Sequence, residues 1–217
     1  MHLSVDIGST HCGSRKLAKE AISVAKDNGA DSVKFQLFKG SEYKPNIELN
    51  RDLFIELVSY GKEKEIPVTA SAFDVQAVDL LVKLNVPFIK IAYSKSRDLN
   101  LINGLLNTGR KVVVTTDALS LKDYRDDMLL TRLYVDLANG TPQYPVPWMT
   151  SFEGIFPLFD GYSDHHKGIG QAIEAVQMGA TWLEKHFSLQ YDECKRVPDF
   201  DVSISPRELY ELAKAVK

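Results

Sequence analysis

The sequence has few cysteines, no long apolar run and no excess of positive charge. Only Cys12 and Cys194 occur among 217 residues, without signs of a disulfide framework, so a reducing cytoplasm is expected. No stretch approaches the ~20 apolar residues of a membrane span, and the start, MHLSVDIGST, lacks the features of a signal peptide. A formal net charge of -3 gives no electrostatic case for nucleic acid. We therefore expect a cytoplasmic protein that binds neither membranes nor nucleic acids.

Short runs rich in β-branched residues alternate with amphipathic segments along the chain. The predicted strands are 2–8, 32–38, 67–73, 87–93, 111–117, 132–138, 159–165 and 181–187. The predicted helices are 14–28, 50–65, 74–85, 98–107, 168–178 and 206–216. The last of these opens with a capping box between Ser205 and Glu208. The segment 118–131 is too polar to predict a helix, and 140–158 is typical of a loop.

This alternation predicts either a doubly wound open sheet or a closed (β/α)8 barrel. The number of strands favours the barrel, and no Gly-x-Gly-x-x-Gly pattern follows the first strand to support a dinucleotide-binding sheet. No composition shift marks a domain boundary. We predict an α/β protein that forms one compact (β/α)8 TIM barrel over residues 1–217, near the lower size limit of this fold.

The alternation of side chains along each strand predicts which residues face the barrel interior. In 32–38, the apolar positions face the helices and leave Lys34, Gln36 and Phe38 inside. Most inward polar residues lie near the carboxyl ends of strands, where barrel enzymes carry their active sites. We therefore predict that they line one pocket, together with the acid–histidine endings of 159–165 and 181–187. The inward polar residues are Asp6, Lys34, Gln36, Lys90, Thr115, Asp117, Ser163, His165, Glu184 and His186.

Two lysines, Lys34 and Lys90, are predicted to lie inside the barrel. An unpaired buried lysine costs several kcal/mol of desolvation, so each requires a partner. One interpretation is structural, with the partners supplied by Asp6 and Glu184. The other is that the lysines bind an anionic ligand, with hydroxyl groups on neighbouring strands as further donors to a phosphate or carboxylate. Those hydroxyl groups belong to Thr115 and Ser163.

Two histidines, His165 and His186, end adjacent strands and face inward. Hydrogen-bonded core histidines are one interpretation, but their position favours a shared divalent metal ion. Two imidazoles are too few for a structural zinc site, and an open octahedral ion such as Mn²⁺, completed by water and substrate oxygens, fits better. One of the neighbouring carboxylates then holds a metal-bound water or a substrate hydroxyl. We interpret His2 and His166 as incidental.

Seven stretches spread over nearly the whole chain match a known pattern. They are DIGSTHCGSRKLAKEAISVAKDNGADSVKFQLF, FIKIA, VVVTT, YPVP, GYSDHHKG, GATWLEKHFSL and PDFDVSISPREL. In this order they resemble the sialic acid synthase family, which includes the N-acetylneuraminate, pseudaminic and legionaminic acid synthases. The resemblance implies a barrel-shaped transferase that condenses phosphoenolpyruvate with an N-acetylmannosamine-like aldehyde sugar and releases phosphate. It also implies a homodimer.

The resemblance further implies roles for individual residues. His165 and His186 hold a divalent metal ion, Mn²⁺ with Mg²⁺ or Co²⁺ as alternatives, that polarises the aldehyde oxygen. The residues assigned to catalysis are Asp6, Lys34, Lys90 and Glu184. The residues assigned to phosphoenolpyruvate are Lys34, Lys90, Thr115 and Ser163. The residues assigned to the sugar are Gln36, Tyr144 and Asp199.

The chain also departs from the family pattern. Tyr93 replaces a serine and is expected to crowd the phosphate site or to re-aim it, and Lys95 stands where an acid assists at C2 of the substrate. The remaining departures are Asp6 for Glu, Thr10 for Asn, Asp117 for Gly, Pro142 for Asn and Phe200 for His. The family's small C-terminal antifreeze-like domain has no counterpart up to Lys217. A catalytically degenerate barrel that binds anion and metal as a partner subunit is therefore the alternative.

Two loops on the same face are candidate lids, residues 39–49 and 140–150. They contain Tyr43, Tyr144 and Trp148, whose rings stack on a sugar in one interpretation and pack the loop in the other.

Overall fold

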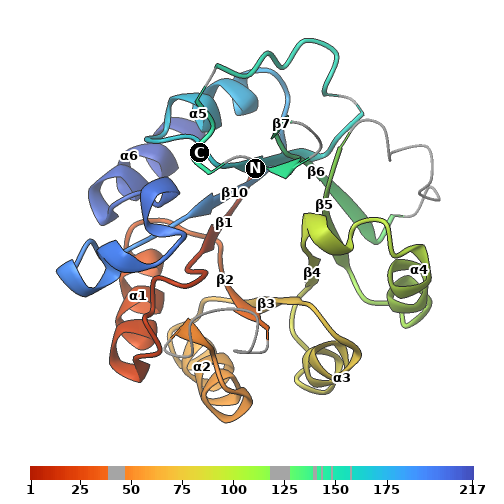
Figure 1. The fold of residues 1–217 in the computed structure, drawn as a ribbon, viewed down its shortest axis with the longest axis vertical. Helices are drawn as coiled ribbons and strands as arrows, with labels where there is room; N and C mark the ends of the chain where they lie inside the picture. The colour runs from red at the N-terminus through yellow and green to blue at the C-terminus, as the bar shows by residue number, and fades with distance from the viewer. Residues whose placement is uncertain (39–46, 118–127, 139–140, 143, 148, 157) are drawn as a thin grey trace.

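The computed structural model describes residues 1–217 except 39–46, 118–127, 139–140, 143, 148 and 157. Eight parallel strands close into a barrel, with helices around its outside (Figure 1). Neighbours around the barrel follow chain order, and the last strand pairs with the first. The strands are β1 (His2–Asp6), β2 (Ser32–Leu37), β3 (Val68–Ala72), β4 (Ile89–Ile91), β5 (Val112–Thr116), β6 (Leu130–Tyr134), β9 (Gly161–Asp164) and β10 (Trp182–His186). The predicted barrel is confirmed.

The described helices lie where the amphipathic pattern predicts them. They are α1 (Arg15–Asp27), α2 (Arg51–Glu63), α3 (Val75–Lys83), α4 (Leu99–Asn107), α5 (Gly170–Gln177) and α6 (Pro206–Val216). Side-chain oxygens of Ser14, Asn50 and Asp74 cap the first three helices, and Ser205 forms the predicted capping box with Glu208 at the start of α6. Among the described residues, no helix is both long and apolar enough to cross a membrane.

Strand register brings the polar residues of different strands to the same level. Asp6 of β1 pairs in register with Lys34 of β2 and with His186 of β10. Glu184 is level with Ser163 of β9. The alternate residues of β1, such as Leu3 and Val5, are fully buried in the main apolar core. The barrel therefore separates an outer apolar layer from an inner polar one, as the alternation predicts.

The sixth strand differs from its prediction. The predicted strand 132–138 begins two residues earlier, and β6 ends at Tyr134. Beyond it, β7 (Leu137–Ala138) pairs with β8 (Thr141–Pro142) in a small antiparallel sheet that the sequence did not indicate. The reason is that register with β5 fixes β6: Leu130 pairs with Val112. The described part of 140–158 contains no helix, whereas 118–127 lies outside the described residues.

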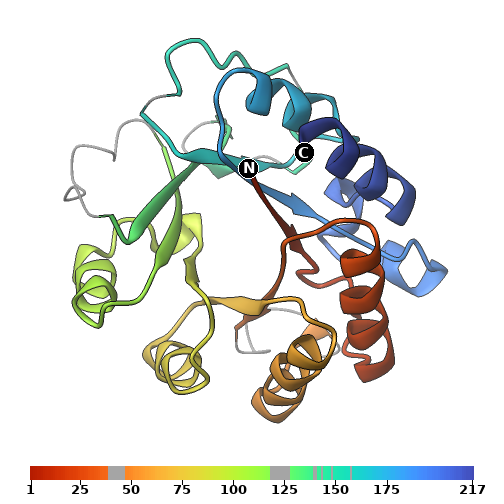
Figure 2. The ribbon, with the colours of Figure 1, turned by 180° about the vertical axis from the view of Figure 1, so that it is seen from behind.

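Both ends of the chain are tied to Asp31, which precedes β2. Its carboxylate accepts a hydrogen bond from the backbone N–H of Leu3 at 2.7 Å and forms an ion pair with Lys217 Nζ at 2.6 Å. Helix α6 thereby closes the ring of helices beside α1 (Figures 1 and 2). The two cysteines also meet, since Cys12 Sγ and Cys194 Sγ lie 3.6 Å and 3.2 Å from the same carbonyl oxygen of Thr10, as free thiols.

Candidate active site

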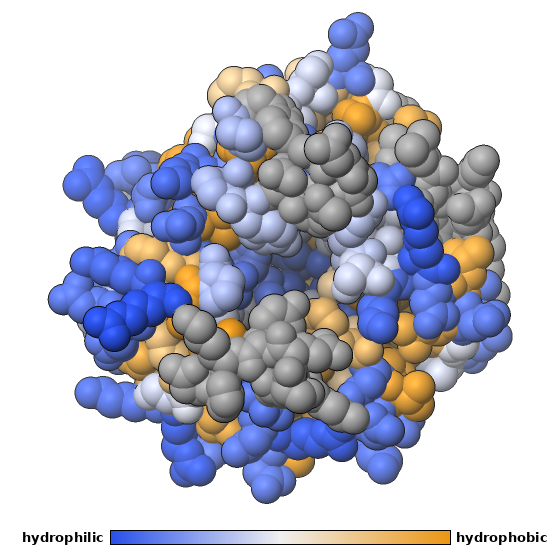
Figure 3. All heavy atoms as spheres, viewed as in Figure 1, coloured by the Kyte–Doolittle hydropathy of each residue, from blue (hydrophilic) through white to orange (hydrophobic). Residues whose placement is uncertain are grey.

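A cavity of about 60 Å³ lies at the carboxyl ends of the barrel strands. Every residue to which the family resemblance assigns a role, except Asp199, lines it: Asp6, Lys34, Gln36, Lys90, Thr115, Tyr144, Ser163, His165, Glu184 and His186. Figure 3 shows one face of the molecule hollowed near its centre, with hydrophilic residues around the hollow. The alternation of the strands therefore predicted the composition of this cavity.

The cavity contains a chain of buried ion pairs. Lys34 Nζ lies 2.5 Å from Asp6 Oδ2 and 3.7 Å from Glu184 Oε2, and Lys90 Nζ lies 2.8 Å from Glu184 Oε1. The four side chains are at most 6% exposed. Without a ligand, each lysine therefore has a carboxylate partner, as the structural interpretation requires. Glu184 links both lysines and holds the centre of the chain.

Burial and neighbouring charges determine the protonation states of Glu184, Lys34 and Lys90. Burial opposes ionisation of Glu184, but the nearby Lys34 and Lys90 lower its pKa to about 2. Burial also opposes the charge of Lys34, yet Asp6 and Glu184 raise the pKa of Lys34 above its ordinary value. For Lys90, burial outweighs the attraction of Glu184, so its pKa is lowered. An additional anion in the cavity would therefore favour the protonated, charged form of Lys90.

Hydroxyl and amide groups surround the charges. Ser163 Oγ donates to Glu184 at 3.1 Å, and Gln36 Nε2 donates to Asp6 at 3.3 Å. Thr115 Oγ1 is buried without a hydrogen-bond partner among the described residues, which is costly unless a ligand satisfies it. Ser71, which accepts from Lys34 Nζ at 3.2 Å, was missed. The alternation along 67–73 could have predicted that Ser71 faces inward, because the outward positions of this strand are Val and Ala.

The two predicted metal ligands lie side by side. The rings of His165 and His186 are 5.4 Å apart at their centroids, and both Nδ1 atoms are buried without a hydrogen-bond partner in the described part of the chain. Burial, followed by the proximity of His186 and Lys185, lowers the pKa of His165 well below its ordinary value, which favours the neutral, metal-binding form. These residues fit an ion with several open positions. The described residues contain no cluster of three or more potential metal ligands.

Tyr144 lies over this histidine pair from the loop after β8. Its ring centroid is 4.2 Å from that of His165 and 6.2 Å from that of His186, and the residue is 50% exposed. The backbone N–H of Val146 donates to the carbonyl of His165 at 3.0 Å, which fixes the loop beside the cavity. Tyr144 is therefore placed to contact a ligand. The other predicted lid aromatics, Tyr43 and Trp148, lie outside the described residues.

Asp199 lies on the rim instead of in the cavity wall. Its Oδ2 accepts hydrogen bonds from the backbone N–H and the hydroxyl of Ser9, both at 2.7 Å. Gly8 permits this approach, since a Cβ there would lie 2.4 Å from the same oxygen and the residue has a φ of +50°. Asp199 is therefore bound to the loop after β1.

Phe38 was predicted to face the barrel interior, and this prediction is wrong. It packs in a separate apolar cluster with Ile47 and Val197, against which Phe200 also packs. The reason is that β2 ends at Leu37, so the alternation does not extend to the next residue. Phe200, a departure from the family pattern, therefore serves packing here.

The departures near β4 and β5 contact each other. The Tyr93 ring lines the cavity, and its hydroxyl donates to Asp117 Oδ2 at 3.1 Å; Arg97 lies 3.7 Å from the same oxygen. Asp117 is buried beyond the end of β5 and does not line the cavity. Lys95 does not line it either. The ammonium group of Lys95, which the family comparison would place near C2 of the substrate, therefore does not lie in the wall of this cavity.

Only one residue of the acid–histidine ending of β9 faces the cavity. His165 does, whereas Asp164 points to the outer face and pairs with Lys185 at 2.9 Å. The prediction that both endings line one pocket is wrong for this acid, because adjacent residues of a strand face opposite sides. His166, interpreted as incidental, is buried and hydrogen-bonded to Asp164.

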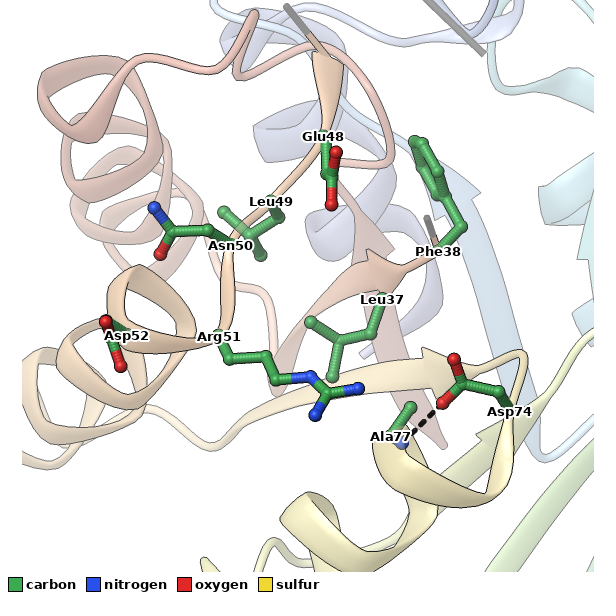
Figure 4. Close-up of a pocket in the computed structure, with 9 residues that line it drawn as sticks. All are labelled: Leu37, Phe38, Glu48, Leu49, Asn50, Arg51, Asp52, Asp74 and Ala77. Carbon is green, nitrogen blue, oxygen red and sulfur yellow. Dashed lines mark hydrogen bonds between the residues drawn. The ribbon is translucent and has the colours of Figure 1, made fainter. Parts of the chain in front are cut away.

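A larger pocket of about 450 Å³ lies beside the ends of β2, α2 and α3 (Figure 4). None of the predicted site residues lines it. Its polar groups are partly engaged in helix capping, since Asn50 accepts from the N–H of Leu53 and Asp74 from the N–H of Ala77. Figure 4 shows the Arg51 guanidinium pointing toward Asp74 across the pocket. The residues that line this larger pocket do not combine lysines, carboxylates and histidines as those of the barrel cavity do.

The closed barrel and its charged cavity define the class: a (β/α)8-barrel protein with a candidate active site at the carboxyl ends of its strands. The model of the NeuB family matches residues 41–217. The chain belongs to the NeuB family. The resemblance to sialic acid synthases is thereby confirmed.

Individual relatives agree with this membership. The N,N'-diacetyllegionaminic acid synthase of Campylobacter jejuni is 28% identical over 249 residues, which cover 98% of this chain and 74% of that protein. The N-acetylneuraminate-9-phosphate synthase of Mus musculus is 29% identical and covers 98% and 68%. The solved N-acetylneuraminic acid (sialic acid) synthetase from Leptospira borgpetersenii, in complex with citrate, has a TM-score of 0.82 at 23% identity, covering 99% and 81%. The last similarity supports the fold.

Proposed function

We propose that the protein is a metal-dependent synthase that condenses phosphoenolpyruvate with an N-acetylmannosamine-like aldehyde sugar, giving a nonulosonic acid and phosphate. An enzymatic role in carbohydrate biosynthesis follows from family membership, because the relatives are named as synthases of sialic-type acids. The observation that carries the specific proposal is the shared cavity, in which two buried lysines lie beside two buried histidines. We further propose a homodimer in the cytoplasm.

The lysines account for the anionic substrate. Phosphoenolpyruvate brings a phosphate and a carboxylate, and its arrival beside Lys90 gives that ammonium a stronger partner than Glu184 alone. The unsatisfied hydroxyl of Thr115 and the hydroxyl of Ser163 then donate to the anion. Glu184, which stays ionised because its pKa is about 2, holds both ammonium groups in place. The binding of the donor substrate thus uses an arrangement that exists before it arrives.

The histidines account for the acceptor. His165 and His186 would hold a divalent ion, Mn²⁺ with Mg²⁺ or Co²⁺ as alternatives, which when bound acts as a Lewis acid on the aldehyde oxygen. Gln36 and Tyr144 line the cavity where the sugar would lie, and Asp199 contributes at the rim. Asp6 Oδ2, 3.7 Å from His186 Nε2, is placed to accept a hydrogen bond from a substrate hydroxyl.

The chemistry balances without a further reactant except water. C3 of the enol ester forms a bond to the aldehyde carbon, whose oxygen gains a proton and becomes a hydroxyl. Water adds at C2 and loses a proton, which balances the proton taken up by the aldehyde oxygen. The tetrahedral intermediate then breaks its C2–O bond to phosphate while the C2 hydroxyl gives its proton to the departing phosphate, leaving the keto acid. The protein contributes position and electrostatic stabilisation to each step.

Phosphate release tests the proposal. Phosphoenolpyruvate is incubated with the protein, Mn²⁺ and a panel of N-acetylated hexoses, and inorganic phosphate is measured. We expect release with at least one sugar, lost in Lys90→Ala and retained in Lys111→Ala, which removes a lysine at the opposite end of the barrel. No release with any sugar would contradict the proposal.

The alternative of a degenerate barrel has one observation in its favour: both cavity lysines are already neutralised by carboxylates. Tight binding of phosphoenolpyruvate and Mn²⁺ without phosphate release would support a partner subunit that only binds them.

A further inference from the structure

Strands β9 and β10 carry a second buried cluster on the face that points away from the cavity. Asp164 and Lys185 are register partners on these strands, and their side chains form an ion pair of 2.9 Å with no exposed surface. A fully buried charge pair therefore lies directly behind the cavity.

His166 closes this pair into a ring. Lys185 Nζ donates to the backbone carbonyl of His166. Asp164 Oδ1 lies 2.9 Å from both the backbone N–H and the ring Nδ1 of His166. The contacts fix the backbone on either side of His165. We refer to these three residues as the Asp164–Lys185–His166 cluster.

The cluster flanks both candidate metal ligands in sequence. Asp164 and His166 stand on either side of His165, and Lys185 directly precedes His186. Since neighbouring residues on a strand share one rigid backbone, the separation of the charged pair on the outer face also determines the separation of the two imidazoles on the inner face. We propose that Asp164, Lys185 and His166 are positioning residues that set the geometry of the histidine pair. This deepens the proposed function, on whose metal site it rests.

The cluster also reaches the loop that carries Tyr144. His166 Nε2 lies 3.3 Å from Thr150 Oγ1, and the backbone N–H of Thr150 donates to Gln171 at 2.6 Å. Together with the bond from Val146 to the carbonyl before His166, these contacts hold both ends of the segment after Tyr144. The contact between Thr150 and His166 thereby ties the segment that follows Tyr144 to the same cluster.

Stability alone does not account for such a cluster. Replacing a buried ion pair with well-packed apolar residues is often neutral or stabilising, because the charges must be desolvated. Orientation does account for it, since a charge pair whose two members also hydrogen-bond to His166 fixes distance and direction in a way that apolar packing does not. Groups that orient metal ligands in this manner typically change metal affinity 10- to 100-fold when they are mutated.

Manganese affinity is the first measurement. Asp164→Asn keeps the shape of the side chain and removes its charge, and Mn²⁺ binding to the full chain is followed by electron paramagnetic resonance. We expect affinity to fall ~10- to 100-fold, with phosphoenolpyruvate affinity of the metal-free protein unchanged. Lys217→Met is the matched control, since it removes a partly exposed Lys–Asp ion pair elsewhere. Affinity within twofold of wild type, in a variant with a native circular dichroism spectrum, would overturn the proposal.

Nuclear magnetic resonance of ¹⁵N-labelled histidines separates this inference from the metal itself. The chain has 5 histidines, and in metal-free protein Asp164→Asn should shift the ring signals of His165 and His186 while leaving His2 unchanged. Shifted signals in a protein that binds no Mn²⁺ would uphold the positioning role and contradict the metal in the proposed function. Unshifted signals would overturn the positioning role. If Asp164→Asn does not fold, His166→Gln, which retains the ion pair, is measured in the same way.

Discussion

The two ends of the barrel interior use the same strands for opposite kinds of contact. At the amino ends, Phe88 before β4 and Trp182 of β10 meet edge to face, with ring centroids 5.1 Å apart. Two residues further along each strand segment, Lys90 and Glu184 form an ion pair of 2.8 Å. The interior thus changes from an aromatic contact to a charged one within a single step of the alternation.

This difference separates stability from ligand binding along one axis. The amino end forms its own apolar cluster, Phe88, Val113, Leu133 and Trp182, which closes this end of the barrel by apolar contacts. The carboxyl end holds charged groups that are costly to bury and that a ligand can reach. Changes at the amino end should therefore affect the free energy of unfolding and leave binding intact, whereas changes at the carboxyl end should affect binding, and stability only through the charges buried there.

The largest expected effect comes from Trp182→Ala. Removing the buried indole leaves a cavity at the amino end, and we expect the free energy of unfolding to fall by ~3–5 kcal/mol. Denaturant titration measures it. Phosphoenolpyruvate affinity of the folded variant should stay at the wild-type level, and a loss of binding in a folded variant would break the separation.

Acid should act on the carboxyl end. Because the pKa of Glu184 is lowered to about 2 in the folded protein, its ionisation stabilises the fold above its ordinary pKa of about 4.5, and this contribution is lost as pH falls toward 2. The loss is on the order of 3 kcal/mol. Unfolding free energies measured across this range should fall less steeply in Glu184→Gln, and parallel curves would refute the assignment.

Substitution of a histidine can be compared between the two ends of the barrel. His186→Ala should weaken Mn²⁺ binding at least ~100-fold, about 2.7 kcal/mol, because one of two imidazole ligands is lost. His2→Ala at the amino end, where the ring stacks on Trp182, should leave the metal content unchanged. Metal retention by both variants after dialysis would count against the site.

The smallest of these effects is expected for Lys90→Ala. Hydrogen bonds to charged groups contribute about 1.5–3 kcal/mol, so phosphoenolpyruvate affinity measured by calorimetry should fall roughly 30-fold. The fold should persist, since Glu184 keeps Lys34 at 3.7 Å. Lys111→Ala is the control at the amino end, and equal losses in both variants would show that the two ends are not independent.

Much of the candidate site was predictable because strand alternation is strictly periodic. It placed Lys34, Lys90 and Glu184 in the cavity from sequence alone. It failed for Phe38, where the strand ends earlier than the apolar pattern suggests, and for Asp164, where alternation was not applied to the acid of an acid–histidine pair. The buried role of His166 was missed because two of its partners, Thr150 and Lys185, lie on other elements.

The eight-stranded barrel, the approximate helix boundaries and most of the inward polar residues could be read from the amino-acid pattern, because periodicity and capping are properties of neighbours along the chain. Which charges meet depends on the three-dimensional fold. Lys34 pairs with Asp6 and Lys90 with Glu184, Tyr93 meets Asp117, and Asp164 meets Lys185 behind the cavity. These pairings depend on strand register and barrel closure, which bring residues together that are distant in sequence.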